Sequence, residues 1–407
     1  MKTYLVGGAV RDALLGVPVK DRDWVVTGAT PEDMTTLGYR PVGRDFPVFL
    51  HPDTNEEYAL ARTERKSGRG YHGFVFHTSP DVTLEQDLAR RDLTINAMAQ
   101  DEDGRIIDPY HGQSDLRKGI LRHVSPAFSE DPVRILRVAR YATRYAAQGF
   151  RIAPETLTLL KQIVSAGEAD SLVAERVWNE LVDALAEQAP SVFFNVLREC
   201  DALAVLLPEV DRLFGVPQPE KHHPEIDTGI HTMMVVDMAA QMNASTEVRF
   251  AALCHDLGKG TTDPEILPRH TGHEARGEQL IMQLCRRLSA PRRYLELARL
   301  VCLYHTHCHR AGELRPSTLL KVLEAMDAFR RPERLEEFLL ACEADSRGRK
   351  NFEDADYPQA EIFRRAFHAA DRADISDLVA GGAAGPVIQE TLKKRRTDAI
   401  RQTLAEQ

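Results

Sequence analysis

The first 110 residues alternate short hydrophobic runs with turns, whereas the rest of the chain has helical periodicity. Runs at residues 4–6, 25–26, 47–50 and 57–61 are predicted as strands. From about residue 117, hydrophobic positions recur every three to four residues, which indicates amphipathic helices. The pattern predicts an α+β fold, in which a small mixed sheet is followed by helices.

A glycine pair follows the first predicted strand. Gly7 and Gly8 interrupt the hydrophobic run, and a helical pattern begins at residue 9. Bare backbone N–H groups between a strand and a helix are typical of a phosphate-binding turn. Arg11 lies in the first turn of this helix and can reach the same anion. A tight turn without a ligand is the simpler alternative for the glycine pair alone.

Two carboxylates come soon after this turn. Asp21 and Asp23 are two residues apart in a run that leads into the strand at 25–26. Side chains two apart on a strand share a face, so both carboxylates are predicted to point the same way. Adjacent carboxylates are costly without a cation, and Mg²⁺ prefers oxygen ligands. We therefore predict a magnesium site at Asp21 and Asp23.

A basic helix is predicted after residue 130. Arg134, Arg137, Arg140 and Arg144 fall within about 120° of arc on one helical face. Residues 117–151 hold eight lysines or arginines and two acids, whereas the whole chain has a formal charge of −9. This asymmetry indicates that a polyanion docks on the helix, although a solvated arginine face is the usual alternative.

The start of the same helix indicates base selection. Asp131 precedes Arg134 by about one helical turn. Cytosine and adenine each offer an exocyclic amine beside a ring nitrogen, which a carboxylate and an arginine match. Uracil and guanine place a carbonyl where the amine would be. Asp131 and Arg134 are therefore predicted to favour C and A.

Cysteine content and hydropathy indicate a cellular compartment. All six cysteines lie in the second half without a Cys-x-x-Cys pair, which favours reduced thiols over a disulfide framework. No hydrophobic run approaches the ~20 residues of a membrane span, and the N-terminus shows no signal segment. We predict a cytoplasmic protein that has no membrane partner.

The N-terminal motifs resemble those of a known family. Gly7-Gly8-Ala-Val-Arg11-Asp12 followed by Asp21-Arg-Asp23 is similar to the signature of nucleotidyltransferases related to DNA polymerase β. The relevant branch contains CCA-adding enzymes and bacterial poly(A) polymerases. The resemblance implies that Asp21 and Asp23 are catalytic and hold two magnesium ions, with Glu57 as a third acidic residue. A solvent-facing glutamate on an edge strand is the alternative for Glu57.

Further positions match nucleotide-binding motifs of this family. Arg91 matches an arginine that contacts the nucleotide, although Arg90-Arg91-Asp92 is also typical of a salt-bridged helix start. Asp131 and Arg134 match the protein template with which CCA-adding enzymes choose C or A. The resemblance implies four further nucleotide-binding residues: Gly8, Arg11, Arg137 and Arg140.

The second half resembles the HD superfamily of metal-dependent phosphohydrolases. His231, the pair His255-Asp256, and Asp345 are similar to the H…HD…D ligand set of that superfamily. Imidazole and carboxylate ligands in this mixture suit nickel, manganese or zinc, which activate water against a phosphate ester. Nickel is our prediction for this site.

Other histidines are additional candidates. The resemblance makes His273 and His305 possible ligands of a second metal, and His270 a further candidate. His307 and His309 belong to a cluster of alternating histidines, for which an adventitious site or ordinary surface is the favoured interpretation.

Together the two halves resemble class II CCA-adding tRNA nucleotidyltransferases that carry a C-terminal HD domain. The resemblance implies addition of C, C and A to the tRNA 3′ end from CTP and ATP. It also implies HD-borne phosphatase, 2′-nucleotidase and 2′,3′-cyclic phosphodiesterase activities. The predicted parts are a nucleotidyltransferase head (1–116), a helical neck and body (117–222), an HD domain (228–345) and a helical tail (346–407). Whether the chain is a monomer or a homodimer stays open.

Two rival interpretations remain. A poly(A) polymerase would share the head, but we would expect a basic C-terminal tail, whereas the basic run at 393–396 is brief and is followed by acids. A signalling phosphohydrolase of the HD type with a degenerate head is disfavoured because Arg11, Asp21 and Asp23 are intact.

Overall fold

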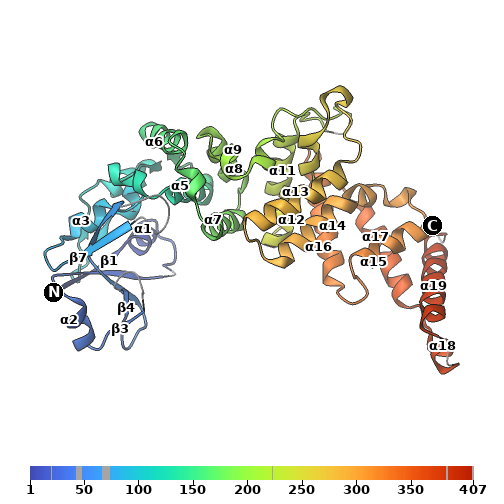
Figure 1. Ribbon diagram of the computed structural model, residues 1–407, viewed down its shortest axis with the longest axis horizontal. Helices are drawn as coiled ribbons and strands as arrows, with labels where there is room; N and C mark the ends of the chain where they lie inside the picture. Colours follow the sequence, from blue (N-terminus) through green and yellow to red (C-terminus); the bar gives the residue numbers. More distant parts are fainter. Residues whose placement is uncertain (20, 43–47, 67–73, 222, 382–383, 406–407) are drawn as a thin grey trace. The chain divides into compact units, whose positions relative to one another are not determined.

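The chain folds into two compact units (Figure 1). The computed structural model describes residues 1–19, 21–42, 48–66, 74–221, 223–381 and 384–405. The first unit comprises residues 1–184 and 192–206, and the second comprises residues 185–191 and 207–407. The sheet lies in the first unit and the second unit is helical in its described part, which confirms the α+β prediction.

A seven-stranded mixed sheet organises the first unit, in the order β3-β4-β5-β2-β1-β8-β9. Strand β1 runs antiparallel to β2, and β2 runs parallel to β5 with Asp23 in register with Glu57. Paired residues on neighbouring strands point to the same face, so these two carboxylates share one face of the sheet. The strands are β1 (Lys2–Val6), β2 (Asp23–Thr27), β3 (Arg40–Pro41), β4 (Val48–Leu50), β5 (Glu57–Leu60), β8 (Ala99–Gln100) and β9 (Ile106–Ile107).

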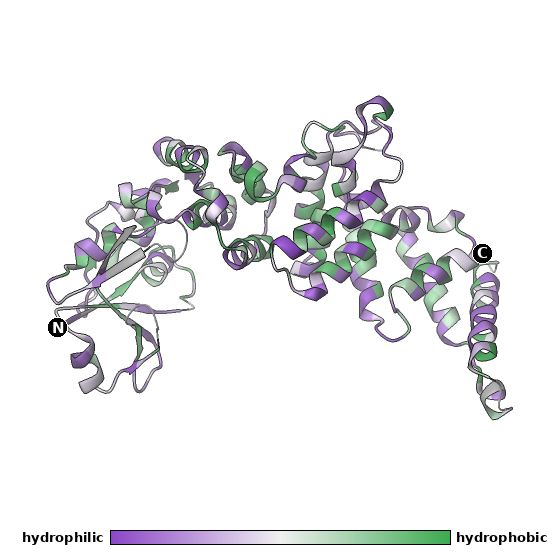
Figure 2. Ribbon diagram, in the orientation of Figure 1, coloured by the Kyte–Doolittle hydropathy of each residue, from purple (hydrophilic) through white to green (hydrophobic). Residues whose placement is uncertain are grey.

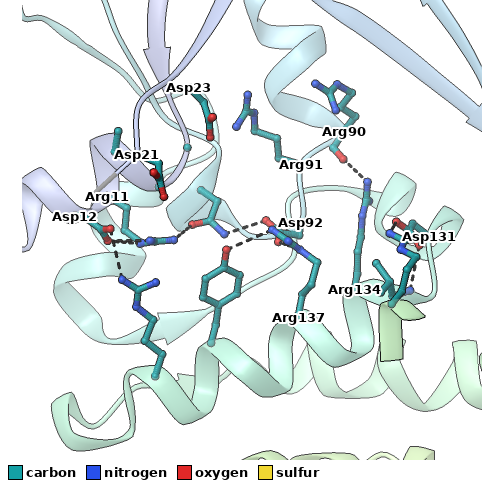
Figure 3. A pocket seen from close by; sticks show the side chains of 18 residues that line it. Arg11, Asp12, Asp21, Asp23, Arg90, Arg91, Asp92, Asp131, Arg134 and Arg137 are labelled. Carbon is teal, nitrogen blue, oxygen red and sulfur yellow. Dashed lines mark hydrogen bonds and ion pairs between the residues drawn. The ribbon is translucent and has the colours of Figure 1, made fainter. Parts of the chain in front are cut away.

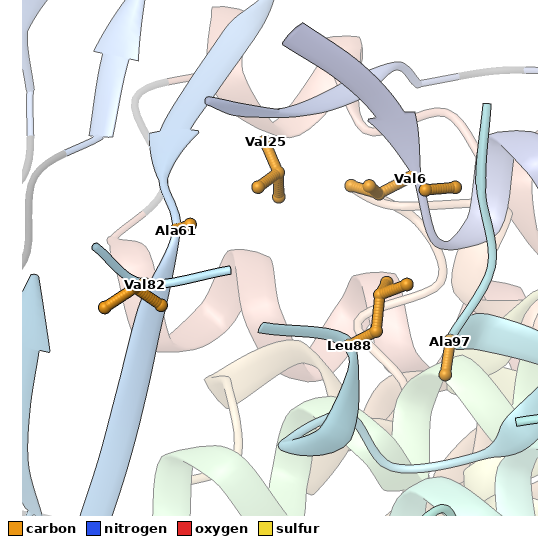
Figure 4. Packing of buried hydrophobic residues seen from close by; sticks show 7 residues of the cluster. Val6, Val25, Ala61, Val82, Leu88 and Ala97 are labelled. Carbon is orange, nitrogen blue, oxygen red and sulfur yellow. The ribbon is translucent and has the colours of Figure 1, made fainter. Parts of the chain in front are cut away.

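The sheet has a hydrophobic core on each face. Val25 belongs to a cluster with Val6 and Leu88 (Figure 4), whereas its neighbour Val26 packs with Met34 and Phe49. Successive strand residues point to opposite faces, which explains the division. The two cores therefore hold the start of β2 in place, next to the predicted carboxylate pair.

The polar, glycine-rich sequence of residues 62–76 predicts a mobile loop, but the structure has a strand at each end of this region. Strands β6 (Arg62–Lys66) and β7 (Phe74–Thr78) pair antiparallel, and residues 67–73 lie outside the described residues. The sequence of β6 has no hydrophobic residue, so alternation gave no signal there, although Phe and Val in β7 favour a strand. The prediction of a loop was wrong for both strands.

Helices complete the first unit. Helix α5 begins at Val133, directly after Pro132, and its hydrophobic residues Ile135, Leu136 and Val138 are buried. This agrees with the predicted basic helix, whose other face carries the arginines. The described helices that lie in this unit wholly or in large part are α1 (Gly8–Leu14), α2 (Pro31–Thr36), α3 (Leu84–Ala89), α4 (Gly112–Lys118), α5 (Val133–Arg144), α6 (Pro154–Ser165), α7 (Ala174–Ala186), α8 (Ser191–Glu199) and α9 (Ala202–Leu206). Short strands β10 (Ile120–Leu121) and β11 (Arg151–Ile152) pair in parallel.

The second unit is built of helices around a hydrophobic core. Phe250 on α12, Val301 on α14 and Phe338 on α16 are fully buried. Hydrophobic and hydrophilic positions alternate along these helices (Figure 2), as amphipathic packing requires. The described helices are α10 (Pro208–Asp211), α11 (Thr228–Gln241), α12 (Thr246–Cys254), α13 (His273–Arg287), α14 (Arg292–His309), α15 (Pro316–Ala325), α16 (Glu333–Arg347), α17 (Pro358–Asp371), α18 (Ser376–Ala380) and α19 (Gly385–Ala405).

All six cysteines are buried free thiols. Among the described helices, none combines the length and the hydropathy that a membrane crossing requires.

Candidate functional site

A cavity of about 490 Å³ lies in the first unit, between the start of the sheet and helix α5 (Figure 3). Seven arginines and five aspartates line it, so charged side chains dominate its wall. Asp21 and Asp23 lie on one side, and Arg134 and Arg137 on α5 lie on the other. The predicted carboxylate pair and the predicted selecting helix therefore share one cavity.

The glycine turn forms part of the wall. Gly7 follows β1 with a φ of +68°, a conformation that strongly favours glycine, and Gly8 begins α1. A Cβ added to Gly7 would lie 2.8 Å from Nη1 of Arg91, so a larger residue would displace that guanidinium. Arg11 is buried and donates hydrogen bonds to Oδ1 of Asp12 and Oδ1 of Asn96. These contacts fix the Arg11 guanidinium in the cavity wall.

The two carboxylates are placed by different means. Asp23 is the first residue of β2, whereas Asp21 precedes the strand, so the strand period does not place Asp21 as the sequence argument assumed. Burial and the neighbouring Asp21 raise the pKa of Asp23, against the lowering effect of Arg91. A raised carboxylate pKa means that the charged pair is unfavourable in isolation, and a divalent cation would relieve this. The donor set thus fits a hard divalent ion.

Glu57 lies beside this pair. It is in register with Asp23 on the parallel neighbour β5, but its side chain is exposed. Glu57 is not one of the described residues that line the cavity. The structure places it within the same sheet face without bringing it into the cavity wall.

Ion pairs tie the arginines of α5 to neighbouring acids. Nε of Arg137 donates to Oδ2 of Asp92 at 2.8 Å, and Arg140 pairs with Glu180 on α7. Burial would raise the pKa of Asp92, but the charge of Arg137 and hydrogen bonds hold it far below the usual value. Arg144 lies 3.6 Å from Asp12.

These pairs change the interpretation of the basic helix. Acids from other segments pair with Arg137, Arg140 and Arg144, so part of the positive charge counted over residues 117–151 is balanced within the fold. Arg134, Arg137 and Arg144 line the cavity, whereas Arg140 does not appear in its described lining. The helix forms an ordered, charged wall.

The predicted selecting residues are also held by partners. Both oxygens of Asp131 accept hydrogen bonds from Arg176 on α7, the shorter at 2.8 Å. Nη1 of Arg134 donates to the carbonyl of Ala127 at 2.8 Å, and Nη2 donates to the carbonyl of Arg90. Both side chains border the cavity with fixed orientations. Arg176 is a residue of this site that the sequence argument missed.

A second cavity, of about 480 Å³, lies in the second unit and has histidines in its wall. Two clusters of buried ligand atoms lie at or beside it, and within each cluster the atoms are less than 4.8 Å apart. The first cluster is His231, His255 and Asp345, and the second is Asp256, His273 and His305. Nε2 of His255 lies 3.0 Å from Oδ2 of Asp256, which links the clusters. The structure therefore brings together all six predicted ligand residues.

These ligands come from widely separated segments. His231 lies on α11, His255-Asp256 directly follows α12, and Asp345 lies on α16. Nε2 of His231 is nevertheless 3.0 Å from Oδ1 of Asp345. His273 begins α13, and His305 lies on α14.

The electrostatics of the clusters fit a divalent cation. Nε2 of His255 faces Oδ2 of Asp256 at 3.0 Å and Oδ1 of Asp345 at 3.5 Å, but neither this nitrogen nor Oδ1 of Asp256 forms a hydrogen bond among the described residues. Burial lowers the pKa of His305 to about 3, so its imidazole is neutral, as a metal ligand must be. A metal ion bound between these buried ligand atoms would satisfy the atoms that form no hydrogen bond.

Several residues around the clusters were missed by the sequence argument. Lys259 lies 2.7 Å from Asp256, and Glu225 lies 2.8 Å from Nδ1 of His231. His309 lies 2.7 Å from Asp345, so the interpretation of this histidine as ordinary surface was wrong. For Lys259, its spacing three residues after Asp256 was an available signal. His270 instead bonds Pro217 and Thr262, outside the two clusters.

Sequence models of three protein families match the chain. The Poly A polymerase head domain matches residues 3–122, the probable RNA and SrmB-binding site of polymerase A matches residues 149–214, and the HD domain matches residues 228–331. The multifunctional CCA protein of Thioalkalivibrio sulfidiphilus is 62% identical over 406 residues, which cover 100% of this chain and 99% of that protein. The chain belongs to the multifunctional CCA protein family.

Solved structures agree with this membership at the level of fold. The CCA-adding enzyme of Bacillus stearothermophilus in complex with CTP is 24% identical, with a TM-score of 0.64 over 98% of this chain and 89% of that chain. The Thermotoga maritima CCA-adding enzyme complexed with tRNA is 21% identical, with a TM-score of 0.64 over 100% of this chain and 91% of that chain. In this multifunctional CCA protein family member, the polymerase head and the HD domain imply dependence on divalent metal.

Proposed function

We propose that this protein adds C, C and A to the 3′ end of tRNA from CTP and ATP without a nucleic-acid template. The observation that carries the proposal is the shared cavity of Asp21, Asp23, Asp131 and Arg134, together with full-length membership of the multifunctional CCA protein family. The same membership favours CCA addition over poly(A) synthesis. This chain would bind tRNA, as the Thermotoga maritima enzyme does.

The charged wall supplies the parts of a nucleotidyl transfer. Magnesium ions held by Asp21 and Asp23 would supply activation of the primer 3′-hydroxyl and charge neutralisation as pyrophosphate leaves. Gly8 gives the triphosphate close access to the backbone, while Arg91 and Arg137 offer donors to it. The structure gives less support to site roles for Glu57 and Arg140, because neither is among the described residues that line the cavity.

The HD domain, in our proposal, hydrolyses phosphate esters, with phosphatase, 2′-nucleotidase and 2′,3′-cyclic phosphodiesterase activities. A transition metal, which we propose to be nickel, would supply activated water. His231, His255 and Asp345 would hold one ion, and Asp256, His273 and His305 a second. Lys259, Arg310 and Arg349 line the same cavity and would attract the phosphate. We also propose a cytoplasmic location and the four domain boundaries given above.

One incubation tests the function directly. Purified protein is mixed with tRNA that lacks its terminal CCA, and with each labelled nucleotide in turn. We expect two C additions followed by one A, with no incorporation of U or G. Repeated A addition would identify a poly(A) polymerase, and hydrolysis without incorporation would identify a phosphohydrolase with an inactive head.

Base selection gives a sharper prediction. Asp131→Ala removes the acceptor for the exocyclic amine, and Arg134→Ala removes the donor to the ring nitrogen. We expect discrimination against UTP relative to CTP, measured as the ratio of kcat/KM values, to fall roughly 10- to 100-fold in Asp131→Ala. Arg134→Ala should relax selection against UTP and GTP in the same direction.

A control variant separates loss of base selection from a general structural effect. Glu130→Ala alters the neighbouring acid, whose side chain is not in the described cavity lining, and should keep the wild-type ratio. Unchanged discrimination in Asp131→Ala, in protein that still incorporates CTP, would refute the proposed role.

A further inference from the structure

Three polar side chains form a chain that leads away from the metal cluster. Nε2 of His309 lies 2.7 Å from Oδ2 of Asp345, and Nδ1 of His309 lies 2.9 Å from the hydroxyl of Tyr357. Asp345 lies on α16, His309 is the last residue of α14, and Tyr357 directly precedes α17. All three border the second cavity.

The direction of each hydrogen bond follows from the acceptor at its end. A carboxylate oxygen can only accept a hydrogen bond, so Oδ2 of Asp345 accepts from Nε2 of His309. Nε2 of His309 must then carry a proton and donate it. A neutral imidazole protonated at Nε2 has a lone pair on Nδ1, which accepts from the Tyr357 hydroxyl. Burial raises the pKa of Tyr357, so the phenol remains a donor.

The consequence concerns the other carboxylate oxygen. With Oδ2 of Asp345 occupied by His309, Oδ1 faces Nε2 of His231 at 3.0 Å and Nε2 of His255 at 3.5 Å. Oδ1 is therefore the atom of Asp345 that lies in the ligand cluster. Groups that hydrogen-bond a metal ligand fix its orientation and typically change metal affinity or activity by about 10- to 100-fold.

We propose that Tyr357 is a positioning residue for the metal centre of the HD domain, acting through His309 to hold Asp345. The proposal rests on the proposed phosphohydrolase function of that domain. Tyr357 lies beyond residue 331, where the match to the HD domain ends, so the segment after the HD domain completes the centre. Glu225, which also lies outside the match, contacts the opposite ligand His231 through Nδ1. Residues outside the HD-domain match therefore contact ligands of the centre directly, as Glu225 does, or through His309, as Tyr357 does.

The first experiment removes only the hydroxyl. Tyr357→Phe and the control Tyr304→Phe, an equivalent change at another tyrosine of this unit, are compared as full-length protein. Ni²⁺ alone is titrated by calorimetry in an Asp23→Asn background, which removes metal binding by the head. We expect Ni²⁺ affinity to fall about 10- to 100-fold in Tyr357→Phe and to stay unchanged in Tyr304→Phe. Hydrolysis of a phosphate monoester should fall with it.

The second experiment tests the route through His309. In His309→Gln an amide N–H replaces Nε2–H and has no tautomer to fix, so Ni²⁺ affinity should stay close to wild type, whereas His309→Ala should bind weakly. Tyr357→Phe should have no further effect when added to His309→Gln. If Tyr357→Phe lowers affinity equally in both backgrounds, or if Tyr357→Phe and His309→Ala both bind Ni²⁺ like wild type, the positioning role is wrong.

Failure of the underlying function looks different. If the wild-type protein neither binds Ni²⁺ through His255 nor hydrolyses phosphate esters, the proposed function of the HD domain fails. If the wild type does both and Tyr357→Phe changes neither, the positioning role alone fails. Thermal unfolding of each variant shows that affinity is compared between folded proteins.

Discussion

Replacing Asp23 by Asn is expected to reduce nucleotide incorporation about a thousandfold while phosphate-ester hydrolysis stays at the wild-type rate. The side chain keeps its size but loses the charge that binds a divalent ion, and such charge stabilisation contributes about 4 kcal/mol to the transition state. Asp21→Asn should act in the same direction. Single-turnover addition of CTP to truncated tRNA measures the effect.

The fold should tolerate this change. Burial and Asp21 already make the charge of Asp23 unfavourable, so Asp23→Asn removes repulsion and should not lower the unfolding temperature. Asp103→Asn makes the same chemical change at an exposed turn between β8 and β9 and should leave incorporation unaltered. Full activity in Asp23→Asn would remove the carboxylate pair from the mechanism.

His255→Asn is expected to have the complementary effect in the second unit. Nδ1 of His255 lies 2.7 Å from the carbonyl of Ala252, whereas Nε2 faces the carboxylates of Asp256 and Asp345 at 3.0 and 3.5 Å and forms no hydrogen bond in the described structure. An asparagine amide can replace the contact made by Nδ1 but leaves nothing at Nε2. We expect Ni²⁺ binding at the cluster to be lost and hydrolysis to fall about a thousandfold, with CCA addition unchanged.

The control is a histidine outside the clusters. His368 is exposed on α17, so His368→Asn should preserve metal binding and hydrolysis. Calorimetric titration with Ni²⁺ and an assay with 2′,3′-cyclic AMP measure both quantities. Wild-type metal affinity in His255→Asn would contradict the assignment of the first cluster.

Much of the framework was predictable because it depends on local sequence. The hydrophobic run at residues 25–26 predicted β2, and the helical period after residue 130 predicted α5. The spacing of His255 and Asp256 pointed to the metal cluster through the resemblance to the HD superfamily. In each case residues close in sequence carry the signal.

The remaining features depend on contacts between distant segments. Arg140 on α5 meets Glu180 on α7, and Arg137 meets Asp92, so charge counted along one helix overstated its exposed positive charge. No periodicity places Tyr357 against His309, because the contact forms only when α14 and α17 pack. Local pattern also failed at β6, where pairing with β7 determines the strand.

The most direct test of the account is a structure of the protein with CTP and Mg²⁺. We predict metal ions at Asp21 and Asp23, the 4-amino group of cytosine at the Asp131 carboxylate, and N3 of cytosine at the Arg134 guanidinium. A cytosine bound away from both side chains, or a triphosphate whose metal ions avoid both aspartates, would contradict it.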